Sequence, residues 1–427
     1  MTVSLEVITN SVVSLNKLFP ISTRQFIQPF KKLVDPDISK GICVDFELCG
    51  REQKNKVNPI LRIARSEDAE ELVGIYKELY NSTYPYKEME DVDEVQKMIL
   101  DPSIQWIIFQ DPSLNIAGCI TFVLDFKNKR GYIRGFMLKK KYQRHIDITK
   151  AMIGSMLGMI HKFRNRIYNW YVENRTAHAK SQYSMWVCGI APIGFYPNKD
   201  VFLGCIESDL MQILYDERSL SVYRCEKIPE IIPCVETSYL YSERRYNLGY
   251  YRLITPEITL CKAKITKIKK SLLKHISKDK YGYETIKFTL KGSSSFFEFL
   301  YTPQVQNFEK TKYKVSNLEE LSVLVQEFVK CGKDLGIRYS EVFVSAYKPE
   351  HQQIFHDAGF FPRGYVPSWN YSKKRGVFKD YILFNTFDGV LDEKIQLINE
   401  GQDLLTALGL HPTRFKMEQN SLSRKVF

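Results

Sequence analysis

One short stretch of the chain, KKKYQRHIDIT, gathers groups that can hold a phosphate. Lys139 to Lys141 and Arg144 bring positive charge to a single turn, and Thr149 adds a hydroxyl for a phosphate oxygen. A solvated basic turn would have the same composition. Phosphate binding and plain solvation therefore both remain open for this stretch.

A second set of residues could move protons. Glu173 is expected at the end of a strand, where its carboxylate could accept a proton from an amine through water, although a lone carboxylate is more often a solvated charge. His145 and His178 could face the same region, but a lone histidine more often makes a structural hydrogen bond. Because two histidines without a third ligand do not make a metal site, we expect no metal.

The composition describes a folded chain of two or three domains. The chain has 427 residues, of which 44% are hydrophobic and 26% charged, so it can bury sizeable cores. Its formal charge of +12 favours polyanionic partners. Nucleic acid, an anionic membrane and a phosphorylated cofactor all satisfy that charge, and charge alone does not choose among them.

The sequence predicts a cytoplasmic protein without a spanning helix. Its first residues, MTVSLEVITNSVVSLNKLFP, lack a basic segment followed by an apolar run, and no later segment has the roughly 18 uncharged apolar residues of a bilayer span. The nine cysteines are scattered from Cys43 to Cys331 and form no Cys-x-x-Cys pair. A reducing compartment suits this cysteine pattern.

The candidate residues fall within a regular series of predicted elements. A strand ending at Ala64 precedes an amphipathic helix over 66 to 80, and three strands follow in QWIIFQD, IAGCITFVLDF and GYIRGFML. A helix through ITKAMIGSMLGMIHKF, a strand IYNWYVE and a helix ended by Gly189 come next. APIGFYP and ESDLMQILY then close the series as two strands. The N-terminal region mixes a helix at RQFIQPFKKLV with a strand at GICVDFEL.

Two nine-residue segments share one frame of glycine, proline and aromatic positions. GIAPIGFYP spans 189 to 197 and GFFPRGYVP spans 359 to 367, and each follows a predicted helix and begins a predicted final hairpin. Matching elements on both sides indicate an internal duplication. The predicted divisions are an extension (1–58), a first domain (59–218), a linker (219–255), a second domain (256–410) and a tail (411–427).

The order of elements and two motifs resemble the GNAT superfamily of acyl-CoA-dependent N-acyltransferases. YQRHIDITKAM lies where that family carries Gln/Arg-x-x-Gly-x-Gly/Ala, and HAKSQYSMWVCGI with IGFYP lies where it has its last helix and hairpin. The resemblance covers about 61 to 218 and, for the C-terminal half of the fold, 316 to 385. It implies an α/β fold of two GNAT-like domains, each a mixed, mostly antiparallel sheet flanked by helices.

The resemblance also implies acetyl-CoA or another acyl-CoA as co-substrate. In the family, backbone amides after the fourth strand and at the start of the next helix hold the pyrophosphate. Gln143 matches the first motif position, whereas Ile146 and Ile148 stand at the two small positions. The residues implied to bind the co-substrate are Met137, Leu138, Gln143, Arg144, His145, Ile146, Asp147, Ile148, Thr149, His178 and Ser181.

Two residues are the implied proton carriers. The family often has a tyrosine near the end of the helix after the fifth strand, and this tyrosine protonates the departing thiolate. Counting back from Gly189 places Met185 there, which has no proton to donate, so Tyr183 is the neighbouring candidate acid. Glu173 is the candidate base.

The second copy is predicted to be non-catalytic. Phe355 and Lys348 stand at the family's tyrosine and asparagine positions, and LYTPQVQNFEKTKYKVSN has no glycine-rich turn. Upstream, residues 261 to 280 carry eight lysines with apolar residues at helical spacing, which predicts a basic amphipathic helix. We expect its apolar face to pack against the protein, with binding to a membrane or to RNA as the alternatives.

These features together predict a soluble N-acyltransferase that transfers an acetyl or other acyl group from acyl-CoA to a primary amine. Two alternatives remain open: a transferase of tandem GNAT-like fold that takes its acyl group from aminoacyl-tRNA, and a non-catalytic GNAT-like binding protein. The acceptor amine and the oligomeric state do not follow from the sequence.

Overall fold

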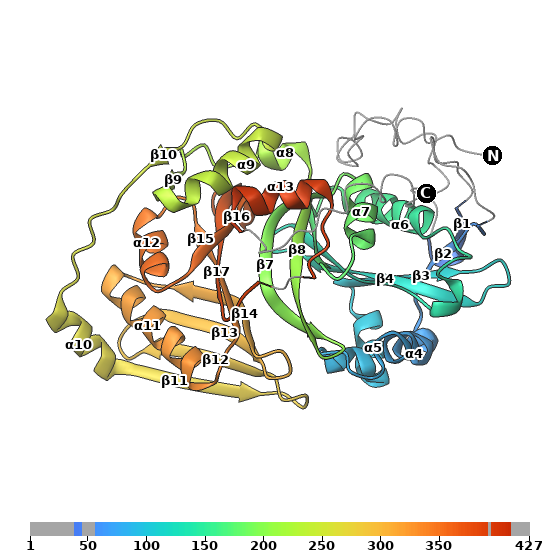
Figure 1. Ribbon diagram of the computed structural model, residues 1–427, viewed down its shortest axis with the longest axis horizontal. Coiled ribbons are helices and arrows are strands. Elements are labelled where there is room, and N and C mark those ends of the chain that lie inside the picture. The colour runs from blue at the N-terminus through green and yellow to red at the C-terminus, as the bar shows by residue number, and fades with distance from the viewer. Residues whose placement is uncertain (1–37, 45–55, 392–393, 411–427) are drawn as a thin grey trace.

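Two mixed β-sheets lie side by side in the computed structural model, and helices flank both of them (Figure 1). The predicted fold class is therefore confirmed. The structure describes residues 38–44, 56–391 and 394–410. The helix predicted at RQFIQPFKKLV and the whole of the predicted tail, 411–427, lie outside these residues.

The first sheet has the strand order β1-β2-β3-β4-β5-β6-β8-β7. Its predicted strands are confirmed, and the edge strand β1 comes from the N-terminal region. The bounds are Ile42–Cys43 (β1), Ile60–Ile63 (β2), Ile104–Gln110 (β3), Ile116–Asp125 (β4), Arg130–Leu138 (β5), Asn169–Arg175 (β6), Ala191–Phe202 (β7) and Cys205–Tyr215 (β8).

Helices cover both faces of this sheet (Figure 1). Helix α6 packs on the face that carries Phe109 and Phe122, and α4 packs on the face that carries Trp106 and Ile108. Strands β3 and β4 are consequently buried on both faces over most of their length. The helices in this half are Ala69–Tyr80 (α4), Val92–Leu100 (α5), Ile148–Phe163 (α6) and Lys180–Val187 (α7), with short 3-10 turns at Ile38–Lys40, Ser66–Asp68, Lys87–Glu90 and Lys140–Tyr142.

The second sheet repeats the arrangement of the first, with the order β11-β12-β13-β14-β15-β17-β16. In both sheets the final strand, β8 or β17, pairs with the strand that precedes the last helix, so the first strand of the last hairpin, β7 or β16, lies at the edge. The strands are Leu272–Lys278 (β11), Glu284–Leu290 (β12), Phe296–Thr302 (β13), Asn307–Lys314 (β14), Tyr339–Ser345 (β15), Phe361–Ser372 (β16) and Val377–Phe387 (β17). The helices of this half are Lys262–Ser271 (α10), Leu318–Asp334 (α11) and Pro349–Asp357 (α12), whereas Asn399–Ala407 (α13) packs on β7 of the first sheet.

The basic helix predicted over 261 to 280 is half as long as expected. Helix α10 ends at Ser271, and the rest of the stretch forms β11. Seven cross-strand pairs with β12, from Leu272 opposite Leu290 to Lys278 opposite Glu284, hold that strand. The prediction was wrong here because partners along β12 outweigh local helical spacing.

The two repeat segments, 189–197 and 359–367, form matching irregular strands. β7 shifts register between Pro192 and Gly194, and β16 shifts between Pro362 and Gly364. Both strands have a second bulge beyond their next proline. At that bulge, Asn198 and Ser368 each have φ of 51°, a left-handed backbone conformation.

The repeat segments also pack against each other at the contact between the halves. A Cβ placed on Gly364 would lie 2.4 Å from the carbonyl oxygen of Ile193 and 2.7 Å from the Cα of Gly194. A Cβ on Gly194 would lie 3.3 Å from Leu383. The shared glycine therefore permits two strand backbones to touch, which explains why the frame occurs in both segments.

The residue after each left-handed position reaches into the other half. Lys199, after Asn198, lies 3.4 Å from Glu341 of β15. Trp369, after Ser368, has its ring centroid 4.0 Å from the guanidinium of Arg130 on β5. Each bulge thus places one large side chain against the parallel strand pair of the opposite half.

The segment predicted as a linker, 219–255, is largely folded. It begins within Glu217–Leu220 (α8) and contains Glu230–Ile231 (β9), Pro233–Val235 (a 3-10 turn), Glu236–Tyr246 (α9) and Arg252–Leu253 (β10). Ser242 of α9 donates to the carbonyl oxygen of Tyr365 at 2.7 Å, which ties the segment to β16. Across the described ranges, the structure has no helix long and apolar enough to cross a membrane.

Candidate functional site

The parallel strands β5 and β6 separate partway along their length. They pair from Arg130 opposite Asn169 to Ile133 opposite Val172. Glu173 is the next residue of β6, while β5 continues to Leu138 paired with β4. Open α/β sheets bind ligands beyond the carboxyl ends of their strands at such a break in pairing, so this point is the natural candidate site.

The predicted phosphate turn follows β5 directly. Gln143, Arg144 and His145 are exposed, and Gln143 Nε2 is 3.5 Å from the carbonyl oxygen of Leu138. Ile146 instead turns inward and is buried against Leu138 and Ala117. The bulky side chain at this small-residue position therefore fills a gap inside the protein.

The amides at the start of α6 already have partners within the protein. The Asp147 carboxylate accepts from the N–H groups of Thr149 and Lys150 at 3.2 and 3.3 Å. The Asp147 N–H donates to Val57, and the Ile146 N–H donates to Tyr142. A pyrophosphate at these amides would meet a buried carboxylate, so the backbone cradle implied by the resemblance does not fit coenzyme A as folded. Of the neighbouring basic side chains, those of Lys140, Lys141 and Arg144 are exposed.

Glu173 lies in a buried ionic cluster. Lys199 Nζ is 2.8 Å from Glu173 Oε2 and 3.4 Å from Glu341 Oε2, and its side chain is 2% exposed. Glu309 of β14 approaches the same ammonium group at 4.0 Å. One lysine of the first half therefore joins a carboxylate of that half to two carboxylates of the second.

Burial raises the pKa of several carboxyl groups in this cluster. The pKa of Glu341 rises to about 7, because burial outweighs the attraction of Lys199. The carboxyl groups of Asp200 and Asp209 interact with each other; burial raises the pKa of Asp200 to about 6, and it also raises that of Asp209. Groups that hold a proton near neutral pH can donate or accept one during a reaction.

Lys199 and Asp200 were not among the residues singled out from the sequence. The signal was present as PNKD, a polar run inside an otherwise apolar strand of the first repeat segment. Tyr86, which directly precedes the 3-10 turn Lys87–Glu90, donates to Asp200 at 3.1 Å, so the connection between α4 and α5 also contributes to the cluster. Within the described part of the chain, no three His, Cys, Asp or Glu residues are arranged to hold a metal.

The candidate residues on and just before α7 are not part of the ionic cluster around Lys199. His178 lies just before the helix, where partial loss of solvent around the ring and the charge of Arg175 lower its pKa. Ser181 is half-buried, and Met185 is fully buried in the core of the first half. Burial also raises the pKa of the Cys188 thiol to about 12, which leaves that thiol protonated.

Glu173 and Tyr183 occupy opposite faces of the first sheet. Glu173 pairs with Met211 across β6 and β8, whereas Tyr183 packs against the cluster that contains Leu210. Since neighbouring strand residues point to opposite faces, the two candidate catalytic side chains do not come together. The carboxyl group of Asp200, unlike the Tyr183 hydroxyl, interacts with Lys199 and Glu173.

The second half lacks a carboxylate at the position equivalent to Glu173. In the first half, Glu173 lies opposite Met211, which pairs with Gly194. In the second half, Phe343 lies opposite Leu383, which pairs with Gly364. This phenylalanine stacks on Trp369, so an aromatic contact replaces the ionic one.

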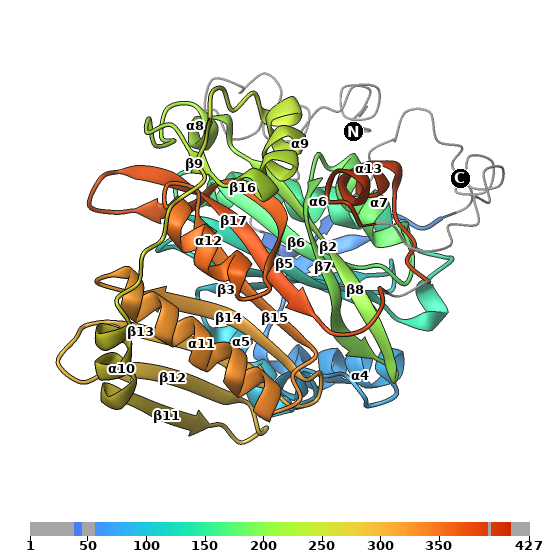
Figure 2. The same ribbon diagram turned by 60° about the vertical axis from the view of Figure 1, so that its left-hand side comes forward.

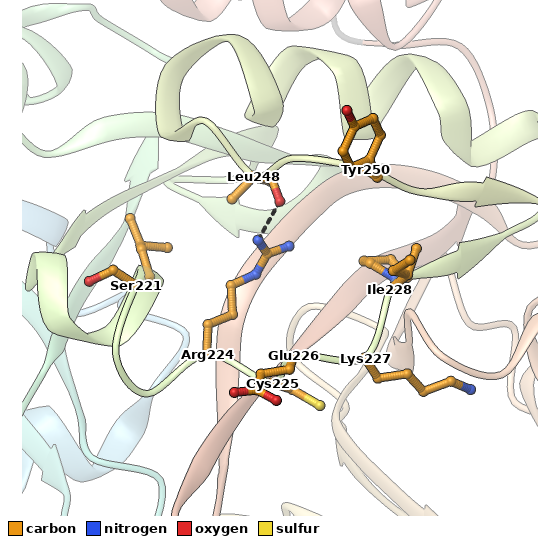
Figure 3. Close-up of a pocket in the computed structure, with 10 residues that line it drawn as sticks. Ser221, Arg224, Cys225, Glu226, Lys227, Ile228, Leu248 and Tyr250 are labelled. Carbon is orange, nitrogen blue, oxygen red and sulfur yellow. Dashed lines mark hydrogen bonds between the residues drawn. The ribbon is translucent and has the colours of Figure 1, made fainter.

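A pocket of about 260 Å³ lies away from these residues, in the segment between the halves (Figure 3). Arg224 borders it, but the guanidinium is bound to Asp380 at 2.6 Å and to the carbonyl oxygen of Leu248 at 2.6 Å. None of the predicted site residues lines this pocket. Arg224 therefore has a structural role, because it pairs with the fully buried Asp380.

Comparisons with known proteins find similarity only among solved structures. No protein-family profile and no curated protein matches the chain. A dodecameric spermidine N-acetyltransferase from Vibrio cholerae is 13% identical, covering 38% of this chain and 96% of its own, with a TM-score of 0.32. A ribosomal-protein-S5-alanine acetyltransferase from Vibrio fischeri is 13% identical, covering 39% and 96%, also with a TM-score of 0.32.

Proposed function

We propose that the protein is an N-acyltransferase that transfers an acetyl or other acyl group to a primary amine where β5 and β6 separate. The observation that carries this proposal is the position of Glu173. It is the first β6 residue beyond the β5 pairing, and it is bound to the buried Lys199. The proposed donor is acetyl-CoA or a longer acyl-CoA, held by the exposed basic side chains of the turn after β5, because Asp147 occupies the amides at the start of α6.

The reaction needs one proton acceptor and one proton donor. A bond forms between the amine nitrogen and the acyl carbon, and the bond from that carbon to the leaving atom of the donor breaks. The amine loses a proton and the leaving atom gains one. Glu173, which Lys199 contacts at 2.8 Å, is the proposed acceptor, and the paired carboxyl groups of Asp200 and Asp209 are the proposed donor.

The second half contributes to this site in the proposal. Glu309 and Glu341 share Lys199 with Glu173, so they set how strongly that lysine holds the proposed base. Tyr339 donates to Glu341 at 2.9 Å and fixes its carboxylate. The second half is then a positioning partner, in keeping with the phenylalanine at its own equivalent site.

A second candidate keeps the reaction class and changes the donor to an aminoacyl-tRNA. The specific observation in its favour is Asp147, whose carboxylate occupies the amides at the start of α6. A donor held by basic side chains and by nucleic-acid contacts has no need of those amides.

Calorimetric titration with acetyl-CoA separates the candidates. The proposal expects binding by the wild-type protein, weaker binding by Q143A/R144A, and tighter binding by D147A, which frees the amides of Thr149 and Lys150. If neither wild type nor D147A binds acetyl-CoA or longer acyl-CoAs, the acyl-CoA proposal fails. Charged tRNA at low salt would then be tested for aminoacyl transfer, and failure there would leave a non-catalytic binding protein.

A further inference from the structure

One face of the second sheet is covered, and the other is open over the outer strands β11 to β13 and the end of β14. At β15 and β17 that second face packs against the first half. On β12, Ile286, Phe288 and Leu290 are buried beneath α11, while Lys287 and Thr289 between them are not (Figure 2). This alternation is typical of a strand with one solvated face. The corresponding strands of the first half, β3 and β4, are buried on both faces.

The difference comes from the connection at the start of each sheet. In the first half, α4 and α5 lie between β2 and β3 and cover one face. In the second half, β11 passes to β12 through a short turn over 279 to 283 that contains no helix. No counterpart of α4 and α5 is therefore present in this part of the described chain to cover that face.

Basic side chains line the open face in cross-strand rows. His275 of β11 lies opposite Lys287 of β12, which lies opposite Glu298 of β13, which lies opposite Lys312 of β14. Lys314 lies opposite Phe296 in the next row. Directly opposed residues share a face, so these side chains form one surface, which we call the lysine face and define by His275, Lys287, Lys312 and Lys314.

The lysine face belongs to the most basic segment of the second half. Residues 261 to 315 contain 13 lysines and four acidic residues, which gives this segment a net charge of +9 within the chain's +12. Glu298 pairs with Lys287 at 3.2 Å, whereas Lys312 and Lys314 are exposed on β14. Helix α10, which leads into β11, carries five more exposed lysines, but it packs beside α11 and so lies on the covered face of the sheet.

We propose that the lysine face binds the phosphate backbone of a nucleic acid. A row of lysines across neighbouring strands neutralises phosphates and releases counterions, which is the main source of non-specific affinity for nucleic acids. Lysine supplies charge without base-specific geometry, so the contact is to the backbone and carries little sequence preference.

A membrane surface fits these observations less well. Membrane-binding helices insert an apolar face beside their lysines. On α10, Ile268 packs against the core of the second half and Ile265 is half-buried, so the apolar side of that helix faces the protein. The apolar residues of the lysine face itself, such as Phe296, are half-buried and isolated.

The test measures binding of the full-length protein to a labelled single-stranded RNA, and to its duplex, by fluorescence anisotropy between about 50 and 200 mM salt. Wild type should bind with a steep salt dependence. K287Q/K312Q/K314Q should bind about tenfold more weakly or worse, and the slope of log K against log salt should fall by about 2 for three lost phosphate contacts. Circular dichroism checks that the variant is folded.

The matched control is K77Q/K127Q/K374Q, which removes the same charge from exposed positions on α4 and on two hairpin turns outside the lysine face. It should retain the wild-type slope. Equal losses in both variants would show that net charge alone drives binding and would overturn the proposal. Absence of binding to either nucleic acid at the lower salt, or binding only to phosphatidylserine vesicles, would overturn it as well.

Discussion

Replacing Gly364 with alanine should destabilise the contact between the two halves. The new Cβ would lie 2.4 Å from the Ile193 carbonyl oxygen, about 1 Å closer than an ordinary carbon–oxygen contact. Both groups belong to strand backbones, so neither can turn aside as a side chain would. Overpacking of this kind costs about 1–3 kcal/mol, and the backbone clash places G364A at about 2 kcal/mol or more.

Two other glycines provide matched comparisons. In G194A the new Cβ lies 3.3 Å from the end of the Leu383 side chain, which can move by a few tenths of an ångström, so the loss should be smaller than in G364A. In G74A nothing lies within 4 Å and the site is in the middle of α4, so alanine should stabilise by about 0.5–1 kcal/mol.

Chemical denaturation of the three variants tests this order. The midpoint should be highest for G74A, lower for G194A and lowest for G364A, and the slope of the transition should be unchanged. A G364A midpoint equal to that of wild type would refute the close crossing of β7 and β16. So would a G194A loss as large as that of G364A.

Three further predictions concern the ionic cluster. K199A should cost about 3–5 kcal/mol of unfolding free energy because it leaves buried carboxylates unpaired, whereas K97A, at a surface pair with Glu94, should cost about 0.5 kcal/mol or less; thermal melts that show equal losses would contradict this. Because the folded pKa of Glu341 is raised to about 7, its contribution to stability is fully present below its unfolded pKa and is lost as pH rises through 7. Denaturation between pH 5 and 8 should therefore show that the free energy of unfolding falls with pH in wild type and falls less steeply in E341Q. Equal pH dependence in the two proteins would contradict this role of Glu341. E173Q should lower kcat for acyl transfer about 10²–10⁴-fold without loss of folding, and a rate near that of wild type would exclude Glu173 as the base.

Most of the element order could be predicted because the apolar periods and helix stops are local. Gly189 and Gly359, which end the two helices before the final hairpins, have φ of 81° and 91°, as a left-handed cap requires. Asp147 also carried a local signal, since an aspartate directly before an apolar helical run is a common N-cap. The family resemblance implies a phosphate contact for this residue, whereas its carboxylate caps α6.

The ionic cluster could not be predicted from local pattern. Lys199 lies more than a hundred residues from Glu309 and Glu341, and only the packing of one half on the other brings them together. The sequence of β7 shows a lysine in an apolar strand but not what would neutralise it. Similarly, the extended form of β11 depends on β12, which follows it in the chain.

The exchange of Lys199 and Trp369 between the halves has a consequence for self-recognition. If two first halves met through β7, each Lys199 would face β5 and β6 of the other, where the intact protein has Arg130 facing Trp369. Charge would then oppose charge. The two halves of one chain avoid this repulsion. Arg130 of the first half packs on the Trp369 ring of the second, and Lys199 of the first half pairs with Glu341 of the second. Each half is thus matched to its unlike neighbour rather than to itself.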